Sequence, residues 1–242
     1  MQTKRTRIAL IGDSTMQWIR PYRDHNQDYT YAELLLQNDT ISVDLYITPG
    51  MMSHDALILT WQGLQAQFYD YYIFSVGIND CTPRSYPKFL AKMYNRILIA
   101  NNFFHKLFFI LYKTVTATKI QRLLSKFHIS RPWVKVKTYE QNFQRIIEIL
   151  TKETDAKIIF LTIPKTSARV EFILQNINHI IPRYNDVIKK MAADNIYILD
   201  INNLFEADYE LYIPEGIHYS SAGHKIVFQQ ILSIITQQKL PS

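Results

Sequence analysis

The sequence predicts an α/β fold in which helices cover both faces of a parallel β-sheet of about five strands. The first observation is a series of short apolar runs, each of a length typical of a buried strand. The second is that these runs alternate with segments whose apolar residues recur at helical intervals. The expected strands cover residues 7–11, 41–47, 71–76, 157–163 and 196–201.

Each of the first four expected strands runs into a residue that interrupts a strand. The first three are followed by Gly12, Gly50 and Gly77, and Pro164 stops the fourth. Ligands of parallel sheets bind at the carboxyl ends of the strands, so residues just beyond these ends are candidates for a functional site. Those residues are Asp13, Ser14, Gly50, Asn79 and Asp80.

Five segments between and after the strands have helical spacing. Pro182 suits the first turn of its helix, because proline has no N–H to leave unpaired there. Ser220 or Ser221 suits the N-cap of the last helix. The expected helices cover residues 31–36, 56–68, 139–150, 182–191 and 220–237.

The composition is that of one globular domain with a sizeable core. The chain has 242 residues, of which 48% are hydrophobic and 20% charged, which excludes a largely disordered protein. The apolar run at residues 8–11 is too short for a signal peptide, and the aromatic stretch at 97–112 contains polar residues that exclude a membrane span. Cys81 is the only cysteine, which excludes an internal disulfide. We expect a cytoplasmic protein, either free or peripheral at the inner membrane face.

The segment 81–137 makes the protein basic. It holds 12 Lys or Arg and no Asp or Glu, whereas the rest of the chain holds 15 bases against 21 acids, so the net charge is +6. It is too long for a simple connection, and we interpret it as a basic helical cap inserted into one domain that spans residues 1–242. Two interpretations of its charge stay open: a solvated basic face, or a surface for an anionic glycan, a lipid-linked glycan or a membrane. Nucleic acid ranks low among the expected partners, because no recognisable nucleic-acid motif accompanies the basic residues.

Gly12-Asp13-Ser14-Thr15 places a serine directly after the first strand. A serine nucleophile needs a nearby base, a group that orients that base, and donors for the oxyanion. The motif is not the Gly-x-Ser-x-Gly elbow of α/β-hydrolases, because Met16 stands where the second glycine belongs. By itself the tripeptide favours a turn with a helix-capping serine.

A second motif near the C-terminus supplies a histidine and a carboxylate. In Pro214-Glu215-Gly216-Ile217-His218, the Glu215 carboxylate reaches back to the imidazole if the chain turns at Gly216. Glu-x-x-His on a helix also binds iron in helical bundles. Pro214 and Gly216 disfavour a helix, and the sequence has no second such pair, so we expect no metal.

Taken together and in chain order, these motifs resemble the SGNH (GDSL-like) hydrolase superfamily. The resemblance implies a flavodoxin-like three-layer α/β/α fold and no cofactor. It implies that Ser14 is the nucleophile, His218 the general base and Glu215 the triad acid. It also implies an oxyanion hole made by the Ser14 and Gly50 N–H groups and the Asn79 side chain.

The sequence departs from the family pattern at Glu215, where the family usually has aspartate. The extra methylene displaces the carboxylate by about one bond length, which matters for catalytic geometry. Either the loop compensates, or Ser14 and His218 act as a dyad with a backbone carbonyl orienting the imidazole.

Several other polar residues carry weaker expectations. Arg20, Arg23 and Arg84 are candidates to bind an anionic substrate group, and solvated surface arginines are an equal alternative. His224 is expected on a helix surface, and Asp13 is expected to shape the turn.

Two functions share these residues. One is an esterase that removes an acyl group from a carbohydrate or lipid-like alcohol. The other is an O-acyltransferase that acetylates a cell-surface polysaccharide, with a sugar hydroxyl attacking the acyl-serine in place of water. A non-catalytic binding module for an anionic glycan or nucleic acid is the alternative from another class. The sequence does not predict the oligomeric state.

Overall fold

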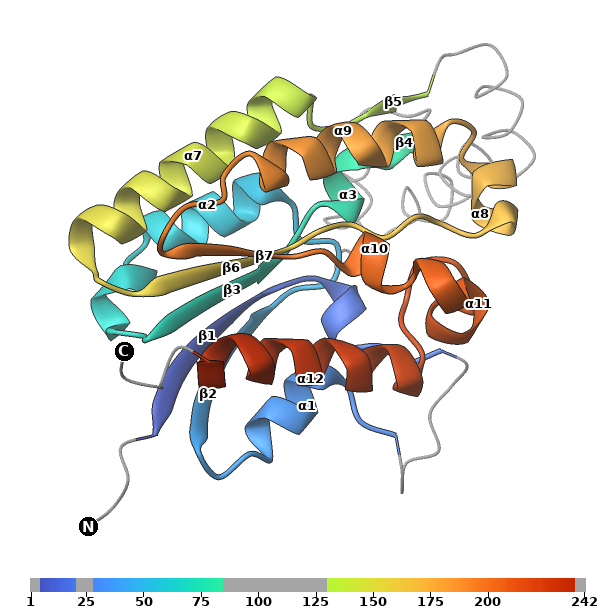
Figure 1. The fold of residues 1–242 in the computed structure, drawn as a ribbon. Helices are drawn as coiled ribbons and strands as arrows, with labels where there is room; N and C mark the ends of the chain where they lie inside the picture. The colour runs from blue at the N-terminus through green and yellow to red at the C-terminus, as the bar shows by residue number, and fades with distance from the viewer. Residues whose placement is uncertain (1–4, 21–27, 85–129, 238–242) are drawn as a thin grey trace, which may run out of the picture.

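The computed structural model describes residues 5–20, 28–84 and 130–237, and a five-stranded parallel sheet lies at its centre (Figure 1). The order across the sheet is β2-β1-β3-β6-β7, and each neighbouring pair is parallel. The predicted α/β fold is confirmed. The strands are β1 (Thr6–Gly12), β2 (Ile41–Ile47), β3 (Tyr71–Ser75), β6 (Lys157–Leu161) and β7 (Ile196–Leu199).

Strand β1 explains why a continuous apolar run is needed at the centre of the sheet. It lies between β2 and β3, and residues 8–11 are completely buried. Successive side chains of a strand point to opposite faces. Accordingly Ile8 and Leu10 join one hydrophobic cluster, whereas Ala9 and Ile11 join the other.

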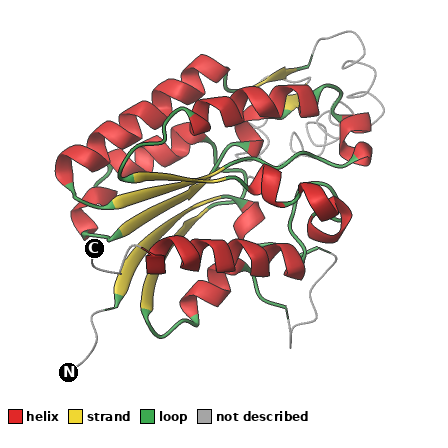
Figure 2. Ribbon diagram, in the orientation of Figure 1, coloured by secondary structure: helices red, strands yellow, loops and turns green. Residues whose placement is uncertain are grey.

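Helices cover both faces of the sheet, as Figure 2 also shows. On one face lie α2 (Ser53–Trp61), α7 (Val136–Glu153) and α9 (Ile177–Lys189), which pack against each other in sequence. On the other face lie α1 (Tyr31–Leu36) and α12 (Ser221–Gln237). The predicted three-layer α/β/α arrangement is therefore confirmed.

Among the described residues, no helix is long and apolar enough to cross a membrane.

The other elements are short. The short elements are η1 (Ser14–Met16), η2 (Leu64–Gln67), α3 (Ile78–Cys81), β4 (Pro83–Arg84), β5 (Arg131–Pro132), α8 (Ala168–Ile173), α10 (Ile201–Leu204), η3 (Glu206–Asp208) and α11 (Tyr209–Tyr212).

The bounds predicted for the helices at 56–68 and 182–191 are wrong. Pro182 lies inside α9 and not in its first turn, because the helix begins at Ile177, whose side chain is completely buried in the core. Helix α2 ends at Trp61 instead of continuing to residue 68. Gly63 takes a left-handed backbone conformation (φ 108°) just beyond it, which breaks the helix.

A small ribbon joins the two ends of the predicted insertion. Strands β4 and β5 pair antiparallel, with Arg84 opposite Arg131. The chain therefore leaves the three-layer domain and returns to it at adjacent positions. The predicted helices of the cap, at 88–112 and 117–127, lie outside the described residues, and the basic cap stays a prediction.

Candidate active site

Ser14 is held in a tight turn at the carboxyl end of β1. Gly12 allows the turn, because a Cβ there would lie 2.7 Å from the Ser75 carbonyl oxygen and closer still to Met16. The buried Asp13 carboxylate caps the turn by accepting hydrogen bonds from Thr15 N (2.9 Å) and Thr15 Oγ1 (2.8 Å). Asp13 thus shapes the turn, as expected. Ser14 is half-buried at the carboxyl end of the sheet.

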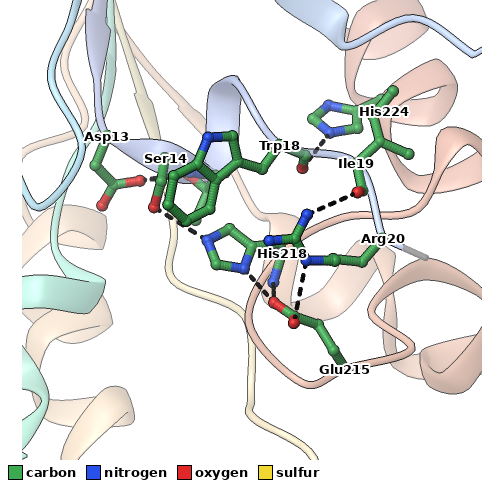
Figure 3. Close-up of polar contacts among 9 residues, drawn as sticks. Asp13, Ser14, Trp18, Ile19, Arg20, Glu215, His218 and His224 are labelled. Carbon is green, nitrogen blue, oxygen red and sulfur yellow. Dashed lines mark hydrogen bonds and ion pairs between the residues drawn. The ribbon is translucent and has the colours of Figure 1, made fainter. Parts of the chain in front are cut away.

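The structure brings together the two motifs that the sequence keeps 204 residues apart. Ser14 Oγ lies 3.0 Å from His218 Nε2 (Figure 3). On the other side of the ring, Glu215 Oε1 forms a hydrogen bond with His218 Nδ1 and accepts one from His218 N at 3.3 Å. A proton on Nδ1 facing the carboxylate leaves the Nε2 lone pair directed at the Ser14 hydroxyl, which is the arrangement a general base requires.

Gly216 allows Glu215 to reach the ring despite its extra methylene. Its φ of 96° lies in the left-handed region, so the loop turns sharply between Glu215 and His218. The sequence left open either a loop that compensates for the longer side chain or a dyad in which a backbone carbonyl orients the imidazole. The contact between Glu215 and His218 matches the compensating loop.

Arg20 and Trp18 surround the Glu215–His218 pair (Figure 3). Arg20 Nε lies 3.4 Å from Glu215 Oε2, and Arg20 N donates to the Tyr219 carbonyl at 2.9 Å. The Trp18 ring lies 4.9 Å from the His218 ring, and the Arg20 guanidinium lies 5.4 Å from the Trp18 ring centre. Arg20, one of the candidates for binding an anionic substrate group, thus contacts the Glu215 carboxylate, and its role toward a substrate stays a prediction.

The predicted oxyanion donors lie at the ends of three neighbouring strands. The Asn79 amide donates to Asp13 Oδ2 at 2.7 Å and to the Met51 carbonyl at 3.3 Å. The second bond is longer than most N–H···O hydrogen bonds and is therefore the weaker of the two. The backbone N–H groups of Ser14 and Gly50 make no hydrogen bond to any other described residue.

A second buried carboxylate, Asp80, follows Asn79 and is hydrogen-bonded to Ser53 at the start of α2. Its oxygens accept from Ser53 N (both at 3.0 Å) and from Ser53 Oγ (2.6 Å), and Asn142 Nδ2 donates to Ser53 Oγ at 2.9 Å. Burial raises the pKa of Asp80 to about 7, although the Ser53 bonds oppose it. Burial also raises the pKa of Asp13, against the hydrogen bonds from Thr15 and Asn79. The contacts of Ser53 and Asn142 were not expected, because no local sequence pattern links them to Asp80.

The remaining predicted residues have different outcomes. Arg84 donates to Asn79 Oδ1 at 3.5 Å and lies 3.8 Å from the Trp133 ring centre, at the base of the predicted cap. Arg23 lies outside the described residues. The prediction that His224 lies on a helix surface is wrong: its side chain is completely buried. It accepts from Tyr31 N (3.2 Å) and lies 3.3 Å from the Trp18 carbonyl oxygen, where it ties α1 to the loop after Ser14.

A serine, a histidine and a carboxylate aligned in this way at the carboxyl end of a parallel sheet define a serine hydrolase. The sequence model of the GDSL-like lipase/acylhydrolase family matches residues 10–226, and the chain belongs to this family. The predicted resemblance is confirmed. No group of His, Cys, Asp or Glu within the described ranges is arranged to hold a metal ion.

Solved structures of other proteins share the fold. A lipase/acylhydrolase from Enterococcus faecalis is 15% identical with a TM-score of 0.58, covering 98% of both chains. An acetylxylan esterase from Geobacillus stearothermophilus is 16% identical with a TM-score of 0.55, covering 96% of this chain and 95% of its own. A G-D-S-L family protein from Veillonella parvula is 14% identical with a TM-score of 0.58, covering 97% of this chain and 100% of its own. A search of curated protein sequences finds no match to this chain.

Proposed function

We propose that this protein hydrolyses an acyl ester of a carbohydrate or lipid-like alcohol through an acyl-serine at Ser14. The observation that carries the proposal is the continuous hydrogen-bonded row from Ser14 Oγ through the His218 ring to the Glu215 carboxylate. Carbohydrate acetates are the first substrates to test, because acetylxylan esterases share the fold. Serine-to-alanine and histidine-to-alanine variants of one such esterase are described as catalytic mutants.

In this mechanism His218 Nε2 takes the Ser14 proton as Oγ attacks the acyl carbon. Glu215 stabilises the imidazolium that forms, and Arg20 holds the Glu215 carboxylate in place. The Ser14 and Gly50 N–H groups and the weakly bonded Asn79 proton stabilise the oxyanion. His218 then protonates the departing alcohol, and a water molecule activated by the same ring releases the acyl group from Ser14.

Replacing Ser14 tests this proposal. We expect Ser14→Ala to lower turnover of p-nitrophenyl acetate by several orders of magnitude, because the nucleophile is lost. Ser42→Ala, which changes an exposed serine on β2, is the matched control and should keep parental turnover. Parental activity in the Ser14→Ala protein would contradict the mechanism.

The same assay distinguishes hydrolysis from acyl transfer. Mass spectrometry of the products is compared with and without unacetylated sugars as acceptors. Free acetate as the main product in both conditions supports the hydrolase. Acetylated sugar as the main product, with little free acetate, would show that the protein is an O-acyltransferase.

A further inference from the structure

A pocket of about 760 Å³ lies beside the loop that carries Glu215 and His218, and the mechanism above does not use it. Its walls come from the segment after β6, the start of α9 and the region of α10, η3 and α11, and Pro214 closes one side. We propose that this pocket binds neutral sugar units of the substrate on the alcohol side of the ester. The inference rests on the proposed function and assigns its substrate class.

The chemistry of ester cleavage decides which part of a substrate lies near this pocket. The acyl oxygen must face Gly50 and Asn79, whereas the departing alcohol must lie beside His218 to receive its proton. The pocket is on the His218 side, because Pro214 lines it and Gly216 packs against another of its lining residues, Ser167. A sugar chain esterified at the site therefore extends past the loop toward the pocket.

One wall of the pocket is already fixed by internal hydrogen bonds. Asn178 Oδ1 accepts from Thr166 N at 2.8 Å, and Asn178 Nδ2 donates to the Thr166 carbonyl at 3.0 Å. Glu171 accepts from the backbone N–H groups of Asn176 (2.8 Å) and Asn178 (2.9 Å). A site whose walls are held in this way binds without a large ordering cost.

Other lining groups are available to a ligand. The Glu206 and Glu210 carboxylates, the Lys165 ammonium and the Asn202 Nδ2 group make no hydrogen bond or ion pair with any other described residue. Asn202 is nevertheless held in place, because its Oδ1 accepts from Lys165 N at 2.9 Å. Carboxylates accept from hydroxyl groups and an amide donates to them, which suits a polyhydroxylated ligand.

The charges of these groups favour a neutral sugar over an anionic one. Two free carboxylates face one ammonium, and no arginine lines the pocket. Arginine is the residue that usually binds carboxylates and phosphates in pairs of hydrogen bonds. An acidic glycan would meet like charges here, which disfavours its binding.

The first test measures binding separately from turnover. Ser14→Ala protein is titrated by calorimetry with neutral tetrasaccharides (xylotetraose, cellotetraose, mannotetraose) and with tetragalacturonate. We expect at least one neutral tetrasaccharide to bind and tetragalacturonate to bind at least tenfold more weakly. Absence of binding by every neutral sugar, or tighter binding of tetragalacturonate, overturns the proposal.

The second test uses the exposed carboxylates of Glu206 and Glu210, whose replacement breaks no hydrogen bond or ion pair among the described residues. In active protein, the double change Glu206→Ala and Glu210→Ala should raise KM for an acetylated form of the bound tetrasaccharide about tenfold. Turnover of p-nitrophenyl acetate should stay parental, as should both activities of Glu148→Gln, an exposed control on α7. An unchanged KM overturns the pocket assignment. Failure of the parent to turn over any ester contradicts the proposed function instead. The calorimetric titration does not depend on turnover, so it still shows whether the pocket binds neutral sugars.

Discussion

At the scale of single residues, the Glu215 carboxylate of the site pairs with Arg20. A glutamate in place of the aspartate usual in the family has one more rotatable bond, so its carboxylate needs an additional contact to stay against the imidazole. Arg20 provides that contact on Oε2 while Oε1 faces His218 Nδ1. We therefore propose that Arg20 positions the Glu215 carboxylate.

A double-mutant cycle tests this role of Arg20. We expect Glu215→Gln to lower kcat by about 10²- to 10⁴-fold, less than His218→Ala, because the amide no longer holds the required tautomer but the base remains. Arg20→Gln should cost about tenfold, and Arg20→Lys less, since a positive charge is kept. In the Glu215→Gln background, Arg20→Gln should cost little more. Fully additive losses would show that Arg20 acts independently of Glu215.

At the scale of elements, the loop between α11 and α12 carries both Glu215 and His218. It is tied to the loop after Ser14 by the bond from Arg20 N to the Tyr219 carbonyl, and it packs on Ser167 at the start of α8. Gly216 is the residue of this loop that lies directly against Ser167. A Cβ there would overlap the Ser167 hydroxyl and lie 2.8 Å from Val170 Cγ2.

Gly216→Ala should therefore move the loop. We expect esterase activity to fall about 100-fold, because small displacements of catalytic groups are costly. Ser167→Gly should restore part of the activity by removing the overlap, although the strain of a positive φ remains. Gly63→Ala is the matched control: Gly63 also has a positive φ (108°), but a Cβ there meets nothing within 4 Å. Activity of Gly216→Ala equal to that of Gly63→Ala would show that the loop tolerates the clash.

At the scale of the whole molecule, the buried carboxylates at the carboxyl end of the sheet make folding depend on pH. Asp80 is completely buried between α3, α2 and α7 and has a pKa of about 7, above the ordinary value of 3.8. Between these two values the folded protein binds more protons at Asp80 than the unfolded chain does. The contribution of Asp80 to the free energy of unfolding therefore falls as pH rises from about 4 to 7 and is constant above 7.

Asp80→Asn should remove this contribution. The difference in unfolding free energy between Asp80→Asn and the parent should grow by a few kcal/mol, in favour of the variant, between about pH 4.5 and 7.5. Urea unfolding at four pH values across this range measures it. Asp39→Asn, at an exposed position, should give a curve parallel to that of the parent. A parallel curve for Asp80→Asn as well would mean that Asp80 is ionised throughout the range.

Most of the architecture follows from local patterns in the sequence. Buried parallel strands must be apolar on both faces, so their positions show as continuous runs. The glycines at the end of β1 and after β2 and β3 mark where the chain turns into the site. Ser14, Gly50, Asn79 and His218 were predicted from such positions and from the family resemblance. Helix ends were less predictable, since α9 starts at Ile177 because that side chain is buried, and burial is not visible in a local pattern.

Contacts between distant segments were decided only by the tertiary structure. The burial of His224 depends on α1 packing against α12, and the engagement of Arg20 depends on the His218 loop lying over the turn after Ser14. An arginine that is 195 residues from its carboxylate partner looks the same in sequence as a solvated one. The sequence by itself therefore determined the fold, the family and the candidate nucleophile and base. The packing of loops decided how a glutamate reaches the histidine, because that geometry depends on backbone turns and neighbours far apart in the chain.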